Sequence, residues 1–130
     1  MIGVDTNILL RLATNDDPAQ VARIRRWLAT HAQGEPLYVN HVVLAEAIWT
    51  LKSVYRADRR KIAHFVDTLL GNAGFEVEDA AVVDDALQSF QSGNVDFPDC
   101  LIAAKNTGLC DLTVTFDKGA ASLPQFTLLK

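Results

Sequence analysis

The stretch Ile2-Gly3-Val4-Asp5-Thr6-Asn7 sets the fold. A short apolar run ends there in a carboxylate, and two side chains that can cap a helix follow at once. We therefore expect a buried strand at residues 2–5 and a helix from Ile8, with Thr6 and Asn7 as its capping residues. A strand that leads directly into a helix is the unit from which parallel α/β sheets are built.

The same alternation continues along the chain. Further short strands are expected at residues 37–39, 75–78, 112–115 and 126–129. Helices are expected to begin at about His41 and at four aspartates, Asp17, Asp58, Asp79 and Asp96. This order predicts an α/β protein, a three-layer α/β/α sandwich with a central, mainly parallel sheet of about five short strands.

Length and composition indicate one soluble domain over residues 1–130. Hydrophobic residues make up 49% and charged residues 22%, and no apolar run approaches the length of a membrane span. No secretory leader is recognisable at the start. Cys100 and Cys110 flank one expected helix, which holds them too far apart for a disulfide, so we expect reduced thiols and a cytoplasmic protein.

Charge is unevenly distributed along the chain, whose net charge is −4. Residues 1–65 hold nine Lys or Arg against six acidic residues, whereas residues 66–130 hold three against ten. The basic residues form two clusters: Arg23, Arg25 and Arg26, then Arg56, Arg59, Arg60 and Lys61. Each cluster alone fits a solvated helix face. Two such clusters, together with an acidic site elsewhere, fit a protein that holds a polyanion by its backbone.

Four acidic residues occupy positions where the chain changes direction. Asp5 and Asp117 end apolar strands, and Asp99 opens an apolar helix. Glu46 is the only charged residue between residues 42 and 51. Carboxylates at the strand ends of an α/β sheet point into the crevice where these folds bind ligands. Because unpaired carboxylates repel one another, their gathering predicts a divalent cation, and ligands that are all oxygen favour Mg²⁺ or Mn²⁺.

Each acidic position also has a structural interpretation. Asp5 fits an ordinary strand end, and Glu46 fits the solvent edge of its helix. The Asp96-Phe97-Pro98-Asp99 pattern fits a capping box, which accounts for one of its two acids. Thr115 stands two residues before Asp117, so that its hydroxyl and the carboxylate can together orient a water molecule.

Other chemistries find less support in the sequence. A haloacid-dehalogenase-type phosphatase requires an acid two residues after its first Asp, where Asn7 stands and cannot protonate a leaving group. The three histidines lack metal-ligand spacing, which argues against zinc. The glycine-rich nucleotide motifs, the P-loop and the serine nucleophile turn are missing.

In order and spacing, these elements together resemble the PIN-domain ribonucleases, and within them the VapC toxins of type II toxin–antitoxin modules. The elements are Asp-Thr-Asn after the first strand, a helical Glu after the second, Asp-x-x-Asp-x-Leu-Ile-Ala-Ala, and Thr-Phe-Asp after the fourth strand. The resemblance covers Ile2 to Leu129 and implies a catalytic quartet that holds Mg²⁺: Asp5, Glu46, Asp99 and Asp117. It further implies support from Thr6, Asn7, Asp96 and Thr115, and a basic position near the site entrance at Arg11.

The resemblance implies a Mg²⁺-dependent endoribonuclease that cuts structured RNA and in which Mn²⁺ can replace Mg²⁺. It also implies a homodimer and a cognate antitoxin protein as partner. Two alternatives from other classes remain open. One is a catalytically inactive PIN-fold scaffold that binds RNA, against which the intact quartet argues. The other is a metal-dependent phosphohydrolase that acts on small molecules.

Overall fold

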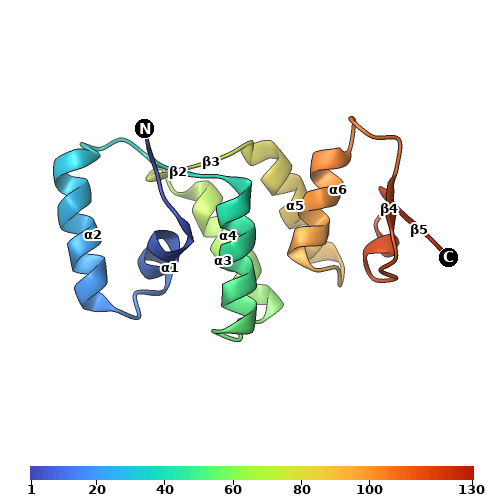
Figure 1. Cartoon of the computed structure of the whole chain (residues 1–130), viewed down its shortest axis with the longest axis horizontal. Coiled ribbons are helices and arrows are strands. Elements are labelled where there is room, and N and C mark those ends of the chain that lie inside the picture. The colour runs from blue at the N-terminus through green and yellow to red at the C-terminus, as the bar shows by residue number, and fades with distance from the viewer. The chain divides into compact units, whose positions relative to one another are not determined.

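Three short parallel strands belong to the first part of the chain. The structure is a computed structural model that describes all 130 residues, in two compact units, Met1–Glu78 and Asp79–Lys130 (Figure 1). In the first unit, β1 (Ile2–Gly3), β2 (Leu37–Val39) and β3 (Phe75–Val77) follow one another in the order β1-β2-β3. Both strand pairs are parallel, with Ile2 in register with Leu37 and Leu37 in register with Phe75.

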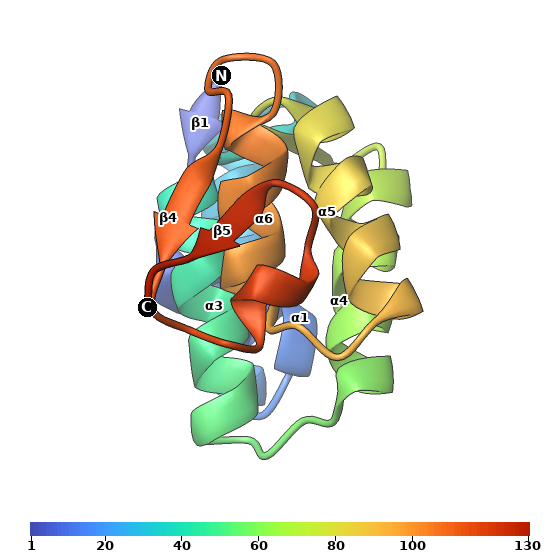
Figure 2. The ribbon, with the colours of Figure 1, turned by 90° about the vertical axis from the view of Figure 1, so that its right-hand side faces the viewer.

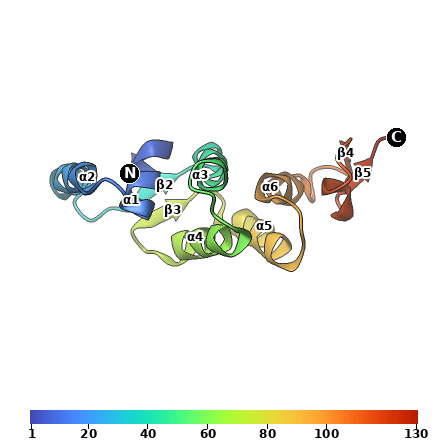
Figure 3. The same cartoon turned by 90° about the horizontal axis from the view of Figure 1, so that it is seen from below.

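Four helices accompany this sheet. They are α1 (Thr6–Thr14), α2 (Pro18–His31), α3 (His41–Ser53) and α4 (Arg59–Gly71). Helix α4 packs against β3, and α1 packs against both α2 and α3 (Figure 3). Their core is aliphatic, and its most deeply buried members are Leu9, Val39, Leu44, Ala47 and Val66. Helix α2 contributes only Val21 to the buried residues, so most of this helix lies at the surface.

The second unit contains two helices and a two-stranded parallel sheet. Helices α5 (Ala80–Ser92) and α6 (Phe97–Asn106) pack closely together, with Phe90 edge-on to Phe97 at 5.6 Å between ring centroids. Strands β4 (Thr113–Thr115) and β5 (Phe126–Leu128) lie side by side, joined by the short 3₁₀ helix η1 (Ala120–Ser122) (Figure 2). Phe126, Ala103 and Ala120 form a small core that ties β5 and η1 to α6.

Several expected helix starts are confirmed. The Asp17 carboxylate accepts a hydrogen bond from the Gln20 N–H at 3.1 Å, and the Asp58 carboxylate accepts one from the Lys61 N–H at 2.9 Å. Asp79 precedes α5 as expected but makes no capping hydrogen bond with its side chain, because its backbone is left-handed with φ 41°. Asn40 caps α3, a role that the sequence did not indicate.

The first helix begins earlier than expected. Helix α1 starts at Thr6, and its cap is Asp5, whose Oδ1 accepts a hydrogen bond from the Ile8 N–H at 3.2 Å. The expectation that Thr6 and Asn7 cap a helix from Ile8 is therefore wrong. The chain leaves the strand two residues sooner, so the carboxylate that ends the apolar run also occupies the capping position.

The α/β class, the parallel pairing and the five short strands are confirmed. The five strands are hydrogen-bonded as one sheet of three and one of two, where the sequence predicted a single sheet. The apolar run from Leu112, which predicts a buried strand, has no buried residue in β4, where Val114 is 56% exposed. Strands β1 and β4 each pair with one neighbour only, and an edge strand has fewer side chains covered.

Both cysteines are free thiols, Cys100 buried in α6 and Cys110 exposed, as expected. None of the helices has the length and apolarity that crossing a membrane requires.

Candidate functional site

The start of α1 and the middle of α3 meet in the first unit. Asp5 is exposed at the N-terminus of α1, where the helix dipole stabilises a carboxylate. Its Oδ1 caps the helix, and its Oδ2 makes no hydrogen bond with the protein. The next residue, Thr6, donates a hydrogen bond from Oγ1 to Glu46 Oε1 at 3.4 Å. The structure therefore places two of the four expected acids on neighbouring elements, joined by one of the expected supporting residues.

Glu46 lies on an exposed face of α3 that is otherwise apolar. Val42, one turn before it, is 67% exposed, and Trp49, three residues after it, is 64% exposed. Thr50, on the same side, donates a hydrogen bond from its hydroxyl to the backbone carbonyl of Glu46 at 3.0 Å. Glu46 therefore lies at the solvent-exposed edge of its helix, as the structural interpretation expected. Exposed apolar side chains such as Val42 and Trp49, grouped around a carboxylate, are also typical of an interaction surface.

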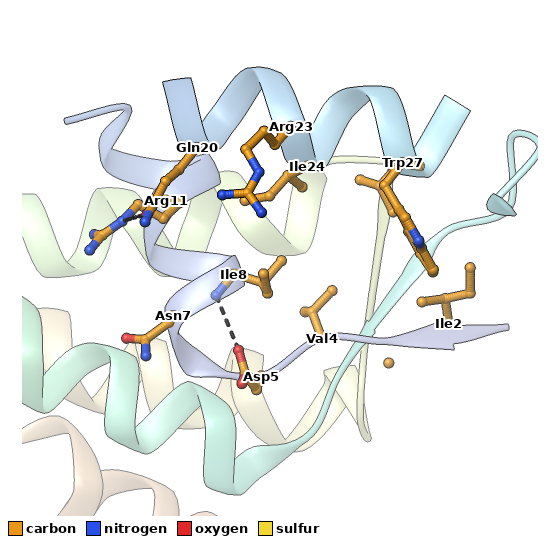
Figure 4. Close-up of a pocket in the computed structure, with 12 residues that line it drawn as sticks. Ile2, Val4, Asp5, Asn7, Ile8, Arg11, Gln20, Arg23, Ile24 and Trp27 are labelled. Atoms are coloured by element: carbon orange, nitrogen blue, oxygen red, sulfur yellow. Dashed lines mark hydrogen bonds between the residues drawn. The ribbon is translucent and has the colours of Figure 1, made fainter. Parts of the chain in front are cut away.

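Arg11 follows Asp5 on α1 and already has several partners. Its Nε donates to Gln20 Oε1 at 2.6 Å (Figure 4). Its Nη1 approaches Asp16 Oδ1 and the Tyr55 hydroxyl, each at 3.4 Å. Tyr55 donates in turn to Asp16 Oδ2 at 2.6 Å. The Tyr55 and Thr14 hydrogen bonds, with the Arg11 charge, hold the pKa of Asp16 below its ordinary value. Arg11 therefore ties α1 to α2 and to the end of α3, a role that sequence reasoning missed.

A groove beside Asp5 runs between α2 and the β1–α1 connection, with a volume of about 770 Å³. Asn7 and Arg11 line it together with Asp5, as Figure 4 shows. Arg23 and Trp27 reach it from α2. The helical spacing of Val21, Ile24, Trp27 and Leu28 predicts a packing face on α2, yet Trp27 is 50% exposed. The sequence does indicate that Trp27 shares a helix face with the charged Arg23, because the two residues are one helical turn apart.

The charges of two carboxylates act on a third, Asp99, in the second unit. Asp99 is half-buried in the first turn of α6, and Asp96 holds the N-cap position of the same helix. Burial, followed by the charges of Asp117 and Asp96, raises the pKa of Asp99 above the ordinary value of 3.8. Asp96 makes no capping hydrogen bond with its side chain, so the capping-box interpretation of Asp96 and Asp99 is wrong. These acids therefore stand close together without helix capping to account for them.

The carboxylate of Asp117 is held firmly by its own turn. Its Oδ1 accepts hydrogen bonds from the N–H groups of Gly119 at 2.8 Å and Ala120 at 3.4 Å. Thr115 Oγ1 accepts a hydrogen bond from the Asp117 N–H at 3.0 Å. Thr115 therefore orients Asp117 through its backbone, and the turn between β4 and η1 fixes where the carboxylate points.

Neither unit by itself contains a ready-made metal cage, since no three His, Cys, Asp or Glu side chains are placed to hold one ion. The donor chemistry nevertheless fits Mg²⁺. This ion is usually held by one or two carboxylates and keeps several waters, and all four expected ligands are carboxylates. A cation beside Asp99 would favour the ionised form of this carboxyl, which its burial disfavours.

The expected basic residues of α2 are exposed. Arg23, Arg25 and Arg26 make no ion pair or side-chain hydrogen bond within the protein, which leaves their charges for a partner. Of the three, only Arg23 lines the groove. Exposure alone fits either a solvated helix or a surface for a polyanion, so RNA binding by this cluster stays a prediction.

Comparisons with known proteins agree with this architecture. A family model described as the PIN domain matches residues 2–124, a range that contains all four expected acids. A VapC ribonuclease from Aquifex aeolicus (strain VF5) is 28% identical to the chain over 109 residues, which is 82% of this chain and 80% of that protein. No solved structure gives a significant match. The chain therefore belongs to the PIN-domain family and is a VapC-like member of it.

Proposed function

We propose that this protein is a metal-dependent endoribonuclease, the toxin of a type II toxin–antitoxin module. It hydrolyses phosphodiester bonds in structured RNA with a metal-activated water. The PIN-domain match and the likeness to a VapC ribonuclease support the ribonuclease activity. The observation that supports the metal dependence is the proximity of Asp117 and Asp96 to Asp99, where burial and then the two charges raise the pKa of Asp99, because a cation stabilises carboxylates that lie close together.

In this proposal Asp5, Glu46, Asp99 and Asp117 are the catalytic residues that hold Mg²⁺, with Mn²⁺ as a substitute. Asp5 and Asp99 are direct ligands, whereas Glu46 and Asp117 act through water molecules, since Mg²⁺ gives up its waters reluctantly. When bound, the ion supplies a water of lowered pKa and neutralises charge on the scissile phosphate.

The surrounding residues hold the four carboxylates in place. Thr6 holds Glu46 by a hydrogen bond, and Thr115 with the Gly119 N–H holds Asp117. Asn7 lies next to Asp5 in the groove, and Asp96 adds negative charge at Asp99. Such neighbours orient ligands and waters, and their loss usually costs activity without loss of the fold.

The remaining parts of the proposal concern partners. Arg11, Arg23, Arg25 and Arg26 attract and hold RNA, whose phosphates favour Lys and Arg surfaces. A cognate antitoxin protein silences the enzyme, which works as a homodimer in the cytoplasm. The family likeness and the exposed basic side chains of α2 support these statements.

The decisive experiment is a cleavage assay with purified protein. Total RNA is incubated with Mg²⁺, with Mn²⁺ or with a chelator, beside a small phosphate ester as a second substrate. We expect RNA fragments with either metal, none in chelator, and no turnover of the small ester. Asp99→Asn should abolish cleavage, and Asp67→Asn, which alters an exposed acid of α4, should not.

Other outcomes would select other functions. RNA binding without cleavage under every metal condition would indicate an inactive scaffold. Turnover of the small ester without cleavage of RNA would indicate a phosphohydrolase for small molecules. If RNA is cut, sequencing the fragment ends after brief expression in bacteria identifies the target, which the four carboxylates do not specify.

A further inference from the structure

The groove beside Asp5 has one wall that the proposed catalytic chemistry does not use. Its far end and sides are formed by α2, with Arg23 and Trp27 facing inward (Figure 4). Its apolar lining residues include Ile2 of β1 and Ile24 of α2. The groove therefore joins a carboxylate at one end to a cation and a large aromatic ring at the other.

Trp27 is presented to solvent rather than to the core. One face of its indole stacks on His31, with ring centroids 4.1 Å apart and planes 12° apart. The side chain is nevertheless 50% exposed and extends from α2 toward Ile2 across the groove (Figure 4). Burying an indole is strongly favourable, and an exposed one held flat by a second ring is a preformed stacking surface.

Arg23 supplies a charge that nothing in the protein neutralises. It is exposed, has no ion pair or side-chain hydrogen bond, and points from α2 into the groove (Figure 4). It precedes Trp27 by four residues, so the two side chains are neighbours on one helix face. Arg25 carries the same charge but does not line the groove, since two residues along a helix lead to the opposite side.

We propose that this groove is a base-stacking subsite for an unpaired stretch of RNA next to the cleaved bond. In it, Trp27 stacks on a base and Arg23 pairs with an adjoining phosphate. Flat apolar faces and phosphates alternate in single-stranded RNA, and aromatic rings with neighbouring cations are how proteins hold such strands. Unpaired loops are also where proteins read structured RNA. The inference rests on the proposed function, because it takes RNA to be the substrate bound at Asp5.

The test measures binding in chelator, where cleavage does not interfere. The probes are a labelled oligouridine of about ten nucleotides and an abasic chain with the same sugar–phosphate backbone. Fluorescence anisotropy at several salt concentrations gives the dissociation constant and its salt dependence. The variants are Trp27→Ala, Trp27→Phe, Arg23→Gln and, as a matched control, Arg25→Gln. Circular dichroism shows that each variant is folded.

A base-stacking subsite predicts a different response from each residue. Trp27→Ala should weaken oligouridine binding on the order of tenfold and leave the abasic chain unaffected, with partial recovery in Trp27→Phe. Arg23→Gln should weaken both probes and reduce the salt slope by about 1. Arg25→Gln should change both probes less than Arg23→Gln does, because its charge acts only at a distance.

Two results would overturn the subsite. If Trp27→Ala binds oligouridine as wild type does, the indole stacks on no base and the groove is left to a protein partner. If Trp27→Ala weakens both probes equally, the effect comes from altered structure. The proposed function is judged separately. If these binding differences are seen but RNA is not cut in Mg²⁺ or Mn²⁺, the nuclease is refuted and the subsite is kept. If RNA is cut but the binding differences are missing, the nuclease is kept and the subsite is refuted.

Discussion

Thr6 Oγ1 donates a hydrogen bond to Glu46 Oε1 at 3.4 Å, across forty residues of sequence. The bond joins the first turn of α1, which Asp5 caps, to the middle of α3. Because a hydroxyl donor is satisfied by any oxygen acceptor, the amide oxygen of a glutamine at position 46 keeps this bond. Charge and structure at Glu46 are therefore separable by a single substitution.

Glu46→Gln should abolish toxicity while it preserves the fold. Expression of the wild type without an antitoxin should arrest bacterial growth, and Glu46→Gln at an equal level should be tolerated. Helix propensity is similar for the two residues, so the melting temperature should change little. Growth curves, together with cleavage of RNA in vitro, measure the effect, with Thr6→Val as the variant that removes the hydrogen bond and keeps the charge.

Growth arrest by Glu46→Gln as severe as that of the wild type would remove Glu46 from the catalytic centre. The solvent-edge interpretation would then suffice, and three carboxylates would remain for the metal. A partial loss of cleavage in Thr6→Val and a complete loss in Glu46→Gln would show that the hydrogen bond positions Glu46 and that its charge is needed for cleavage.

Local chemistry explains which elements were predictable. Asp17 before Pro18 and Asp58 before a basic turn are capping signals confined to a few residues, and both caps form as expected. The strand ends were placed within one or two residues because apolar runs and polar caps adjoin there. Asp79 illustrates the limit, since its left-handed backbone and the missing side-chain cap are not indicated by any local sequence pattern.

The residue types of the candidate site come from the sequence, whereas its contacts come from the structure. Isolated carboxylates in apolar surroundings could be identified from sequence, because burial of an unpaired charge is costly. The pairing of Thr6 with Glu46 depends on how two helices pack, which no short pattern encodes. The same is true of Arg11, whose partners Gln20 and Tyr55 lie on other helices.

Arg11→Gln should lower the cleavage rate even at saturating RNA, if Arg11 lies near the scissile phosphate. Arg11 also binds Asp16 and Tyr55, so its loss has a structural cost on the order of 1 kcal/mol. Tyr55→Phe is the matched control, because it removes hydrogen bonds from the same network and keeps the cation. Single-turnover rates distinguish the two roles, and equal rates in the two variants would make Arg11 purely structural.

Gly119→Ala should impair catalysis by moving one carboxylate. A Cβ at Gly119 would lie 3.2 Å from Asp117 Oδ1, closer than ordinary contact, whereas its φ of −63° suits any residue. Displacement of a reacting group by a few tenths of an ångström should reduce the rate on the order of tenfold. Gly71→Ala, where a Cβ meets nothing within 4 Å, controls for the substitution itself. Equal rates in the two variants would show that the position of Asp117 is unimportant.

Asp99→Asn should stabilise the metal-free protein at neutral pH while it abolishes cleavage. The folded-state pKa of Asp99 lies above 3.8, so the folded protein retains a proton that the unfolded chain releases. The free energy of unfolding should therefore fall as pH rises from 3.8 through the folded-state pKa, and Asp99→Asn should lack this decline. Solvent around the half-buried carboxylate limits the gain to less than about 1 kcal/mol. Thermal unfolding in chelator measures this gain in stability, with Asp111→Asn, at an exposed position, as control.

Added Mg²⁺ should raise the wild-type melting temperature more than that of Asp99→Asn, since a ligand stabilises only the state that binds it. A folded Asp99→Asn less stable than the wild type in chelator would contradict repulsion among these carboxylates.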